Sequence, residues 1–281
     1  MPRLLLLVLF FFLTAYAKER LIASTYAIYY PLSHMAGSFY EVELLIKAQA
    51  DVHHYELKPT DMRRLLQSKA FFYLGVEPWE QKVAKSLPRD KGFPLSQGLE
   101  LIQVGRSYDP HVWLSPRAYI KLVERLRDSL IRLDPPRREE YIKRAEEYIK
   151  RLKSLDEEFS RTLSTCRIRL VVITHASLGY LARDYGLEMV GLRGVHAEEE
   201  PKPSEVRAII ERAKKAGVRF VFYEPGHDRG LAQRFAGELS ARTLPINTSL
   251  VPEAEGDDYF SIMRRNLKRL SEGLECRQSL K

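Results

Sequence analysis

The sequence predicts an α/β fold of two lobes, each a roughly four-stranded parallel sheet with flanking helices, joined by one long linking helix. Two observations predict this. Short apolar runs alternate with longer amphipathic segments from Arg20 onward, which is typical of parallel sheets. One stretch of regularly spaced apolar residues, between residues 141 and 163, interrupts the alternation and is longer than an ordinary helix.

The first half of the chain contains four strand-like runs and four helical segments. Thr60 is expected to cap a helix whose first turn holds Asp61, and Ser115 is expected to cap a helix that has Pro116 at its first position. The expected strands are 21–27, 42–47, 70–74 and 99–104, and the expected helices are 32–35, 60–68, 78–87 and 116–133.

The long helix follows Asp134-Pro135-Pro136 and carries one apolar stripe at spacings of three and four. A helix of nearly thirty residues would be about 40 Å long at 1.5 Å per residue. It would be either a coiled-coil element or a strut across two lobes, and the strands on both sides favour the strut. The stripe consists of Tyr141, Ala145, Tyr148, Leu152, Leu155, Phe159 and Leu163.

The second half repeats the alternation, with Ser204 and Asp258 as the expected helix caps. The expected strands are 168–174, 188–192, 219–223 and 243–247, and the expected helices are 178–185, 204–216, 230–241 and 258–274. We therefore divide the chain into a signal peptide (1–17), an N-terminal α/β lobe (18–134), the long linking helix (135–164) and a C-terminal α/β lobe (165–281).

The first seventeen residues are typical of a secretory signal peptide. Arg3 precedes the apolar run Leu4 to Leu13, and Ala15-Tyr16-Ala17 matches a cleavage site. The run is too short for a comfortable membrane span, although an uncleaved anchor is the alternative. We expect cleavage near Ala17 and a mature chain in the periplasm of a bacterium with two membranes.

Composition indicates a globular chain with a real core, since 45% of the residues are apolar and 29% are charged. The formal charge of +8 becomes +7 when Arg3 is removed, and the basic residues alternate with glutamates along helices. This pattern excludes a nucleic-acid surface. Cys166 and Cys276 either pair, as an oxidising compartment allows, or remain two separate thiols.

Histidine is rare, with seven in 281 residues, and three of the seven lie in segments that suit a metal. These are His53 in D-V-H-H-Y-E, His111 in Y-D-P-H-V-W-L-S-P and His175 in T-H-A-S-L-G-Y. Three neutral imidazoles are a common ligand core for zinc. The wide spacing excludes a local zinc finger, so only the fold can bring the three together.

Each of these histidines is predicted to follow a strand. His53 and His111 follow strands of the first lobe, and His175 lies at the carboxyl end of strand 168–174. Parallel sheets bind ligands outside these strand ends, so two facing lobes would gather all three side chains in one cleft. Taken singly, each would more often be a surface or core residue. Neighbouring groups that would hold or enclose them are Glu56, Asp61, Asp109, Tyr55 and Trp113.

The other four histidines fit the metal interpretation less well. His34, His54 and His227 are expected to be solvent-facing or structural. His196 precedes the acidic run Glu198 to Glu200 and belongs to either a capture loop or an ordinary polar loop.

These segments resemble those of the zinc- and manganese-type substrate-binding proteins of bacterial ABC importers. D-V-H-H-Y-E-L-K-P-T-D, Y-D-P-H-V-W-L-S-P and T-H-A-S-L-G-Y-L-A-R-D-Y-G-L resemble the family's three histidine motifs, in order and spacing, and the resemblance covers nearly the whole mature chain. It implies two lobes joined by a long helix, one divalent cation, and His53, His111 and His175 as its ligands.

The chain departs from the family pattern at the fourth ligand. Members often supply a late aspartate, where this chain has Asn247. The fourth position would then hold water, the Asn247 oxygen, or a carboxylate such as Glu200 or Glu224. The alternative is that Asn247, Glu200 and Glu224 support the ligands without binding the ion. Three imidazoles suit zinc better than manganese or iron(II), and manganese prefers more oxygen ligands.

The predicted function is a monomeric periplasmic receptor that captures a divalent transition-metal ion, zinc first, and delivers it to an ABC permease in the inner membrane. The chain would then not be an enzyme. A zinc-dependent hydrolase with Glu56 or Glu200 as general base is one alternative. A receptor for a metal chelate or an organic ligand is the other.

Overall fold

The computed structural model describes residues 18–47, 52–53, 55–195, 202–226 and 229–277, and contains two separate parallel sheets. The first sheet has the order β2-β1-β3-β4. Its strands are β1 (Arg20–Ala23), β2 (Glu41–Leu44), β3 (Ala70–Tyr73) and β4 (Gly92–Pro94). Leu21, Ile22 and Ala23 on the central β1 are fully buried, as expected where helices cover both faces of a sheet.

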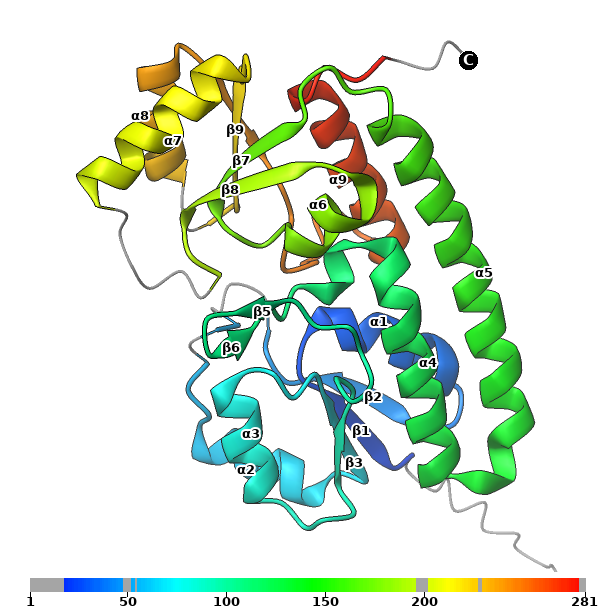
Figure 1. Cartoon of the computed structure of the whole chain (residues 1–281). Coiled ribbons are helices and arrows are strands. Elements are labelled where there is room, and N and C mark those ends of the chain that lie inside the picture. The colour runs from blue at the N-terminus through cyan, green and yellow to red at the C-terminus, as the bar shows by residue number, and fades with distance from the viewer. Residues whose placement is uncertain (1–17, 48–51, 54, 196–201, 227–228, 278–281) are drawn as a thin grey trace, which may run out of the picture.

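The second sheet has the order β10-β9-β7-β8, again with every pair parallel. Two parallel sheets with flanking helices confirm the predicted fold class (Figure 1). The strands of the second sheet are β7 (Leu170–His175), β8 (Glu188–Arg193), β9 (Phe220–Tyr223) and β10 (Arg242–Pro245).

The helices between the strands cover the faces of the sheets, and α5 runs along both of them (Figure 1). In the first half they are α1 (Tyr26–Ala36), α2 (Pro59–Gln67), α3 (Pro78–Lys85), the short 3-10 helix η1 (Val112–Leu114) and α4 (Pro116–Leu133). In the second half they are η2 (Pro135–Arg137), α5 (Arg138–Leu163), α6 (Gly179–Tyr185), α7 (Pro203–Lys215), α8 (Arg229–Leu239) and α9 (Tyr259–Gly273).

The predicted fourth strand of the first sheet is wrong. Residues 99–104 contribute only β5 (Gln103–Val104), which pairs antiparallel with β6 (Ser107–Tyr108) outside the sheet. The fourth strand is β4, a Gly-Phe-Pro segment. Its sequence alone predicts a turn, because glycine and proline are depleted in strands. Phe93 makes it a strand, since its ring stacks on Phe72 of β3 with centroids 5.1 Å apart.

Two of the four predicted helix caps are also wrong. α2 and α7 begin one residue before the expected position, so Lys58 and Lys202 precede the first turns in place of Thr60 and Ser204. In both helices proline occupies the first helical position, where its fixed φ suits the helix and its missing N–H is not needed. The caps at Ser115 and Asp258 are confirmed, as each side chain accepts a hydrogen bond from a backbone N–H.

The apolar stripe of α5 is buried within the chain itself. All seven predicted stripe residues are buried, and the helix packs against α4 along much of its length and also against α1 and α9. The strut interpretation therefore accounts for the stripe, and the stripe has no surface left for a coiled-coil partner. One continuous apolar core includes residues of α5 and of both sheets.

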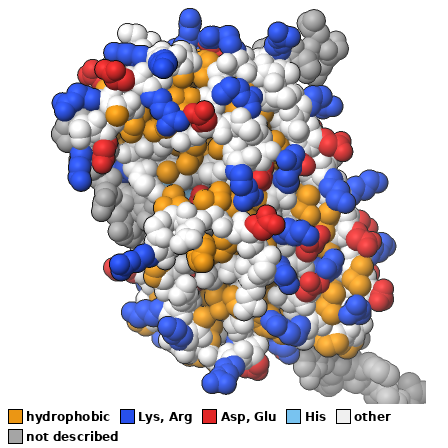
Figure 2. All heavy atoms as spheres, in the orientation of Figure 1, with side chains coloured by type: hydrophobic (Ala, Val, Ile, Leu, Met, Phe, Trp, Pro, Cys, Tyr) orange, Lys and Arg blue, Asp and Glu red, His pale blue; other side chains and the backbone are white. Residues whose placement is uncertain are grey.

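Cys166 and Cys276 form a disulfide, so the paired alternative is confirmed. Figure 2 shows lysine and arginine side chains dispersed over one face of the molecule, with acidic side chains among them. Within the described ranges, every helix is too short or too polar to cross a bilayer.

Candidate metal centre

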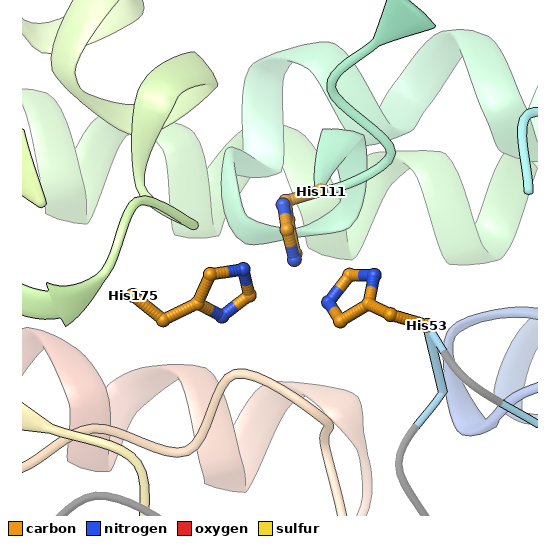
Figure 3. Close-up of side chains that lie close together, drawn as sticks. All are labelled: His53, His111 and His175. Atoms are coloured by element: carbon orange, nitrogen blue, oxygen red, sulfur yellow. The ribbon is translucent and has the colours of Figure 1, made fainter. Parts of the chain in front are cut away.

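The three predicted histidines converge at one point between the two sheets. The ligand atoms of His53, His111 and His175 all lie within 4.8 Å of one another, and their ring centroids are 4.9 to 5.1 Å apart. The rings face a common space (Figure 3). Within the part of the chain that the structure describes, this is the one group of three or more His, Cys, Asp and Glu side chains that is close enough to hold a metal.

The three histidines lie in different kinds of secondary structure. His175 is the last residue of β7, an inner strand of the second sheet, and so lies at the carboxyl end of that strand. His111 follows the hairpin strand β6 and directly precedes η1, so the prediction that it follows a strand of the first parallel sheet is wrong. His53 lies between β2 and α2.

His53 is held by Glu77, which precedes α3. Nδ1 of His53 lies 2.8 Å from Oε1 of Glu77, and the exposed fractions of these side chains are only 7% and 8%. Trp79 supports the same segment because its Nε1–H donates to the carbonyl of Val52 at 2.9 Å. Sequence reasoning named neither Glu77 nor Trp79. The motif E-P-W-E contains the only signal, an acidic residue after a buried strand.

His111 is held by Asp109, as the sequence predicted. Oδ1 of Asp109 accepts from the backbone N–H of His111 at 2.9 Å and lies 2.7 Å from its Nδ1. Burial lowers the pKa of His111 below its usual 6.5, and the contact with Asp109 opposes this only in part. The imidazole is therefore neutral near pH 7, which is the form that binds a metal.

His175 is held by Glu224, which follows β9. Nδ1 of His175 lies 3.0 Å from Oε1 of Glu224, and the hydroxyl of Thr248 donates to that same oxygen. Burial acts to raise the pKa of Glu224, but the hydrogen bonds from His175 and Thr248 outweigh it and lower the pKa to about 2. Glu224 is thus ionised, and accepts hydrogen bonds, throughout the physiological range.

The three ligands share one pattern, because a carboxylate contacts Nδ1 of each imidazole. The carboxylates of Glu77 and Asp109 are buried, and that of Glu224 is partly buried. An ionised carboxylate only accepts hydrogen bonds, so each Nδ1 carries a proton and each Nε2 is the nitrogen suited to a metal. Nitrogens bound to tetrahedral zinc at about 2.0–2.1 Å lie about 3.4 Å apart. The cluster therefore has the donor set for zinc and needs a contraction of at most about 1.4 Å, from 4.8 Å to about 3.4 Å.

The remaining predicted groups lie around the site in different ways. Asp61 accepts from the hydroxyl of Tyr55 and does not contact a histidine in any described hydrogen bond, and Glu56 is exposed. Tyr55 packs against Trp79, whereas the ring of Trp113 lies 5.4 Å from that of His111.

The hydrogen bonds of Asn247 all go to residues in the second half of the chain. Its side-chain nitrogen donates to the carbonyl of Val251 and to Glu253, and its backbone exchanges two hydrogen bonds with Asn266. None of these hydrogen bonds uses its Oδ1, so Asn247 stays a candidate for the fourth ligand.

The remaining predicted positions are His34 and four residues that the structure does not describe. His34 is half-buried and packs against the ring of Tyr148. Glu200, His54, His196 and His227 lie outside the described residues.

Comparison with known proteins now identifies the family. A sequence profile described as ZnuA, zinc-uptake complex component A periplasmic, matches residues 21–273. The zinc-binding lipoprotein AdcA of Streptococcus pneumoniae strain R6 is 31% identical over 278 residues, which cover 91% of this chain and 56% of AdcA. The high-affinity zinc uptake system protein ZnuA of Bacillus subtilis is 27% identical over 280 residues, covering 92% of this chain and 88% of that protein.

Solved structures agree with these matches. The Zn(II)-bound ZnuA-like domain of Streptococcus pneumoniae AdcA has a TM-score of 0.79 and 31% identity, and covers 92% of this chain and 100% of its own. The laminin-binding protein of Streptococcus agalactiae has a TM-score of 0.84 at 24% identity, covering 91% and 99%, which supports the fold alone. The chain spans about half the length of the streptococcal AdcA relatives. The chain belongs to the family of zinc-uptake complex component A.

Proposed function

We propose that this chain is an extracytoplasmic receptor that captures one zinc ion between its two lobes and passes it to an ABC permease. The observation that carries the proposal is the convergence of three imidazoles, each of which contacts a carboxylate through Nδ1. Family membership supports it, since an uptake component is a receptor and not an enzyme. The relatives named above are described as zinc-binding or zinc uptake proteins.

In this proposal the ion is the cargo, and Nε2 of His53, His111 and His175 are its protein ligands. Three nitrogens leave a fourth position on tetrahedral zinc for water or for an oxygen from the chain. Nε2 of His175 lies 2.5 Å from the carbonyl oxygen of Val195. A hydrogen bond there needs a second ring proton, so the arriving ion would displace that proton together with the contact to Val195. Three imidazoles favour zinc over manganese and iron(II), which suit sites richer in oxygen.

We propose residues 18–134 and 165–281 as the two lobes and 135–164 as the link. Residues 1–17 would be a signal peptide that is cleaved near Ala17, which puts the mature chain in the periplasm. The sequence of these residues supports this, with Arg3 before the apolar run and small residues at the cleavage site. The receptor would act as a monomer that docks to its permease in the inner membrane.

The hydrolase alternative has no support from the site. The three carboxylates that contact the histidines are engaged with Nδ1 atoms, and Glu56, the described candidate for a general base, is exposed to solvent. Replacing the histidines distinguishes the chelate alternative from the binding of a bare ion. A chelate held by its organic part would still bind after the imidazoles are replaced, and a bare ion would not.

The test is metal stoichiometry and affinity in metal-free mature protein. Wild-type chain is expected to bind one zinc ion with nanomolar affinity, about −12 kcal/mol. His53→Ala, His111→Ala and His175→Ala should each weaken zinc binding by at least a hundredfold, because each removes a ligand. The matched control is His34→Ala, which removes a half-buried imidazole that packs against Tyr148. Equal zinc binding by all five proteins would refute the proposal.

A further inference from the structure

We propose that Thr248 and Trp113 form a clasp across the two halves of the chain that sets the spacing of His175 and His111 and thereby the preference for zinc. Both are positioning residues, since neither is a ligand. This inference rests on the proposed function, because it concerns the same metal site.

Thr248 makes one contact with each half of the site. Its hydroxyl donates to Oε1 of Glu224, the oxygen that lies 3.0 Å from Nδ1 of His175. Its carbonyl accepts from Nε1–H of Trp113 at 2.8 Å. Thr248 is 4% exposed and Trp113 is 6% exposed, so water does not compete strongly for either hydrogen bond.

Trp113 is held at a second point by the same part of the chain. Its backbone carbonyl accepts from the hydroxyl of Tyr259, the first residue of α9, at 2.8 Å. Tyr259 is fully buried. Thr248 therefore holds the indole ring of Trp113 by a hydrogen bond, and Tyr259 holds its backbone carbonyl by another. Trp113 is two residues from His111, and its ring also lies 5.4 Å from the ring of His111.

These contacts connect two ligands from different parts of the chain, because His175 ends β7 and His111 directly precedes η1. The connection runs from His175 through Glu224 and Thr248 to Trp113 and His111, and all of these groups are buried except Glu224, which is partly buried. If the Thr248 hydroxyl is removed, Glu224 loses a donor and can turn, so the ring of His175 is no longer fixed relative to His111.

The expected consequence is a change in metal preference. Tetrahedral zinc tolerates little variation in the separation of its nitrogens, whereas manganese accepts longer bonds and more oxygen ligands. A loosened site should therefore lose zinc affinity while its weak manganese affinity changes little. A residue that only stabilises the fold would weaken both metals in proportion.

The experiment compares zinc and manganese affinities of metal-free wild type, Thr248→Val, Thr248→Ser and Trp113→Phe, with absorption spectra of the cobalt(II)-loaded proteins. Thr248→Val and Trp113→Phe should each bind zinc roughly tenfold more weakly, the size expected for losing one buried hydrogen bond to this network. Thr248→Ser keeps the hydroxyl and should bind zinc within about twofold of wild type, with an unchanged cobalt spectrum.

The matched control is Tyr141→Phe, which removes a buried hydroxyl that donates to Asp134 at 2.8 Å, away from the histidines. It should leave zinc affinity and the cobalt spectrum unchanged. Wild-type zinc affinity in Thr248→Val and Trp113→Phe would overturn the clasp, as would proportional losses of zinc and manganese affinity. Trp113→Phe provides the test if Thr248→Val does not fold. Failure of wild type itself to bind zinc would instead refute the proposed function.

Discussion

Nδ1 of His53 lies 2.8 Å from Oε1 of Glu77, although 24 residues separate the two in sequence. Glu77 directly precedes α3, and Trp79 in the first turn of that helix holds the carbonyl of Val52, next to His53. The α3 region therefore orients a ligand that it does not contain. This relationship makes Glu77 a sensitive position for metal binding.

Glu77→Gln is expected to weaken zinc binding by 10- to 100-fold, the usual effect of removing a carboxylate behind a ligating histidine. The amide retains the shape but loses the charge that favours Nδ1–H and the basicity of Nε2. Competition against a zinc chelator measures the change. Glu139→Gln, on an exposed side chain of α5, is the matched control and should bind as wild type. Identical affinities in the two variants would contradict this role of Glu77.

Gly179 permits the close approach of α6 to Asp109. A Cβ atom at Gly179 would lie 2.6 Å from Oδ2 of Asp109, the carboxylate that holds His111. Gly179→Ala should push Asp109 away and lower zinc affinity by roughly tenfold, about 1.4 kcal/mol. Titration calorimetry measures this.

The matched control for this change is Gly237→Ala in α8. A Cβ atom there meets no atom within 4 Å. This variant should bind zinc normally and be slightly more stable, because alanine favours a helix by up to about 1 kcal/mol over glycine. If Gly179→Ala behaves in the same way, the contact with Asp109 is not important for the site.

Zinc capture should weaken as the pH falls from 7.5 to 5.5. Protons compete with the ion for imidazole nitrogens, so affinity depends on pH wherever the ligands are protonated in the free protein. Burial lowers the pKa of His111, so this ligand is neutral above its usual pKa of 6.5 and accepts protons only at lower pH. Chelator competition at several pH values gives the profile. A constant affinity across the range would contradict the prediction, since it would mean that no ligand nitrogen takes up a proton above pH 5.5.

Glu80 should make the metal-free protein less stable as pH rises from about 4.5 to 7. Its carboxyl is 1% exposed, and burial raises its pKa to about 7, with some help from the charge of Glu77 and despite hydrogen bonds from the backbone of Leu74 and Gly75. In this window the folded chain holds a proton that the unfolded chain has released. Deprotonation therefore costs up to about 3 kcal/mol, fully expressed above pH 7.

Urea denaturation at pH 5 and 7.5 measures this effect. Glu80→Gln should lack this part of the pH dependence, because the amide does not titrate. Glu139→Gln should keep the wild-type difference, since its side chain is exposed. Equal pH dependence in wild type and Glu80→Gln would show that the Glu80 carboxyl does not hold its proton in the folded state.

The sequence predicted the parts of the fold that have a strong local signal. The Ser115 cap with Pro116 predicted α4, periodic apolar residues predicted α5, and the apolar run before His175 predicted β7 with its ligand. The prediction failed at β4, where only three residues pair and two of them are glycine and proline. The stacking of Phe93 on Phe72 determines that strand, and this is a tertiary contact that local propensity does not contain.

The same distinction applies to the metal centre. Asp109 was predicted because it lies two residues from His111, within reach of a local hydrogen bond. Glu77 was missed because only the folded chain brings it to His53. Glu224 was named as a possible fourth ligand or as a group that supports a ligand, and it contacts Nδ1 of His175 across 49 residues.

The disulfide between Cys166 and Cys276 should stabilise the fold without affecting the metal. It closes a loop across a sequence separation of 110, so removing it should cost about 2–5 kcal/mol by freeing the unfolded chain. Cys166 precedes β7, whereas His175 ends that strand, so the bond and the ligand lie at opposite ends of it. The double variant Cys166→Ser with Cys276→Ser should unfold at lower temperature in a melting experiment, yet bind zinc within about twofold of wild type. An unchanged melting temperature, or a large loss of zinc affinity in the folded variant, would contradict this separation of stability from metal capture.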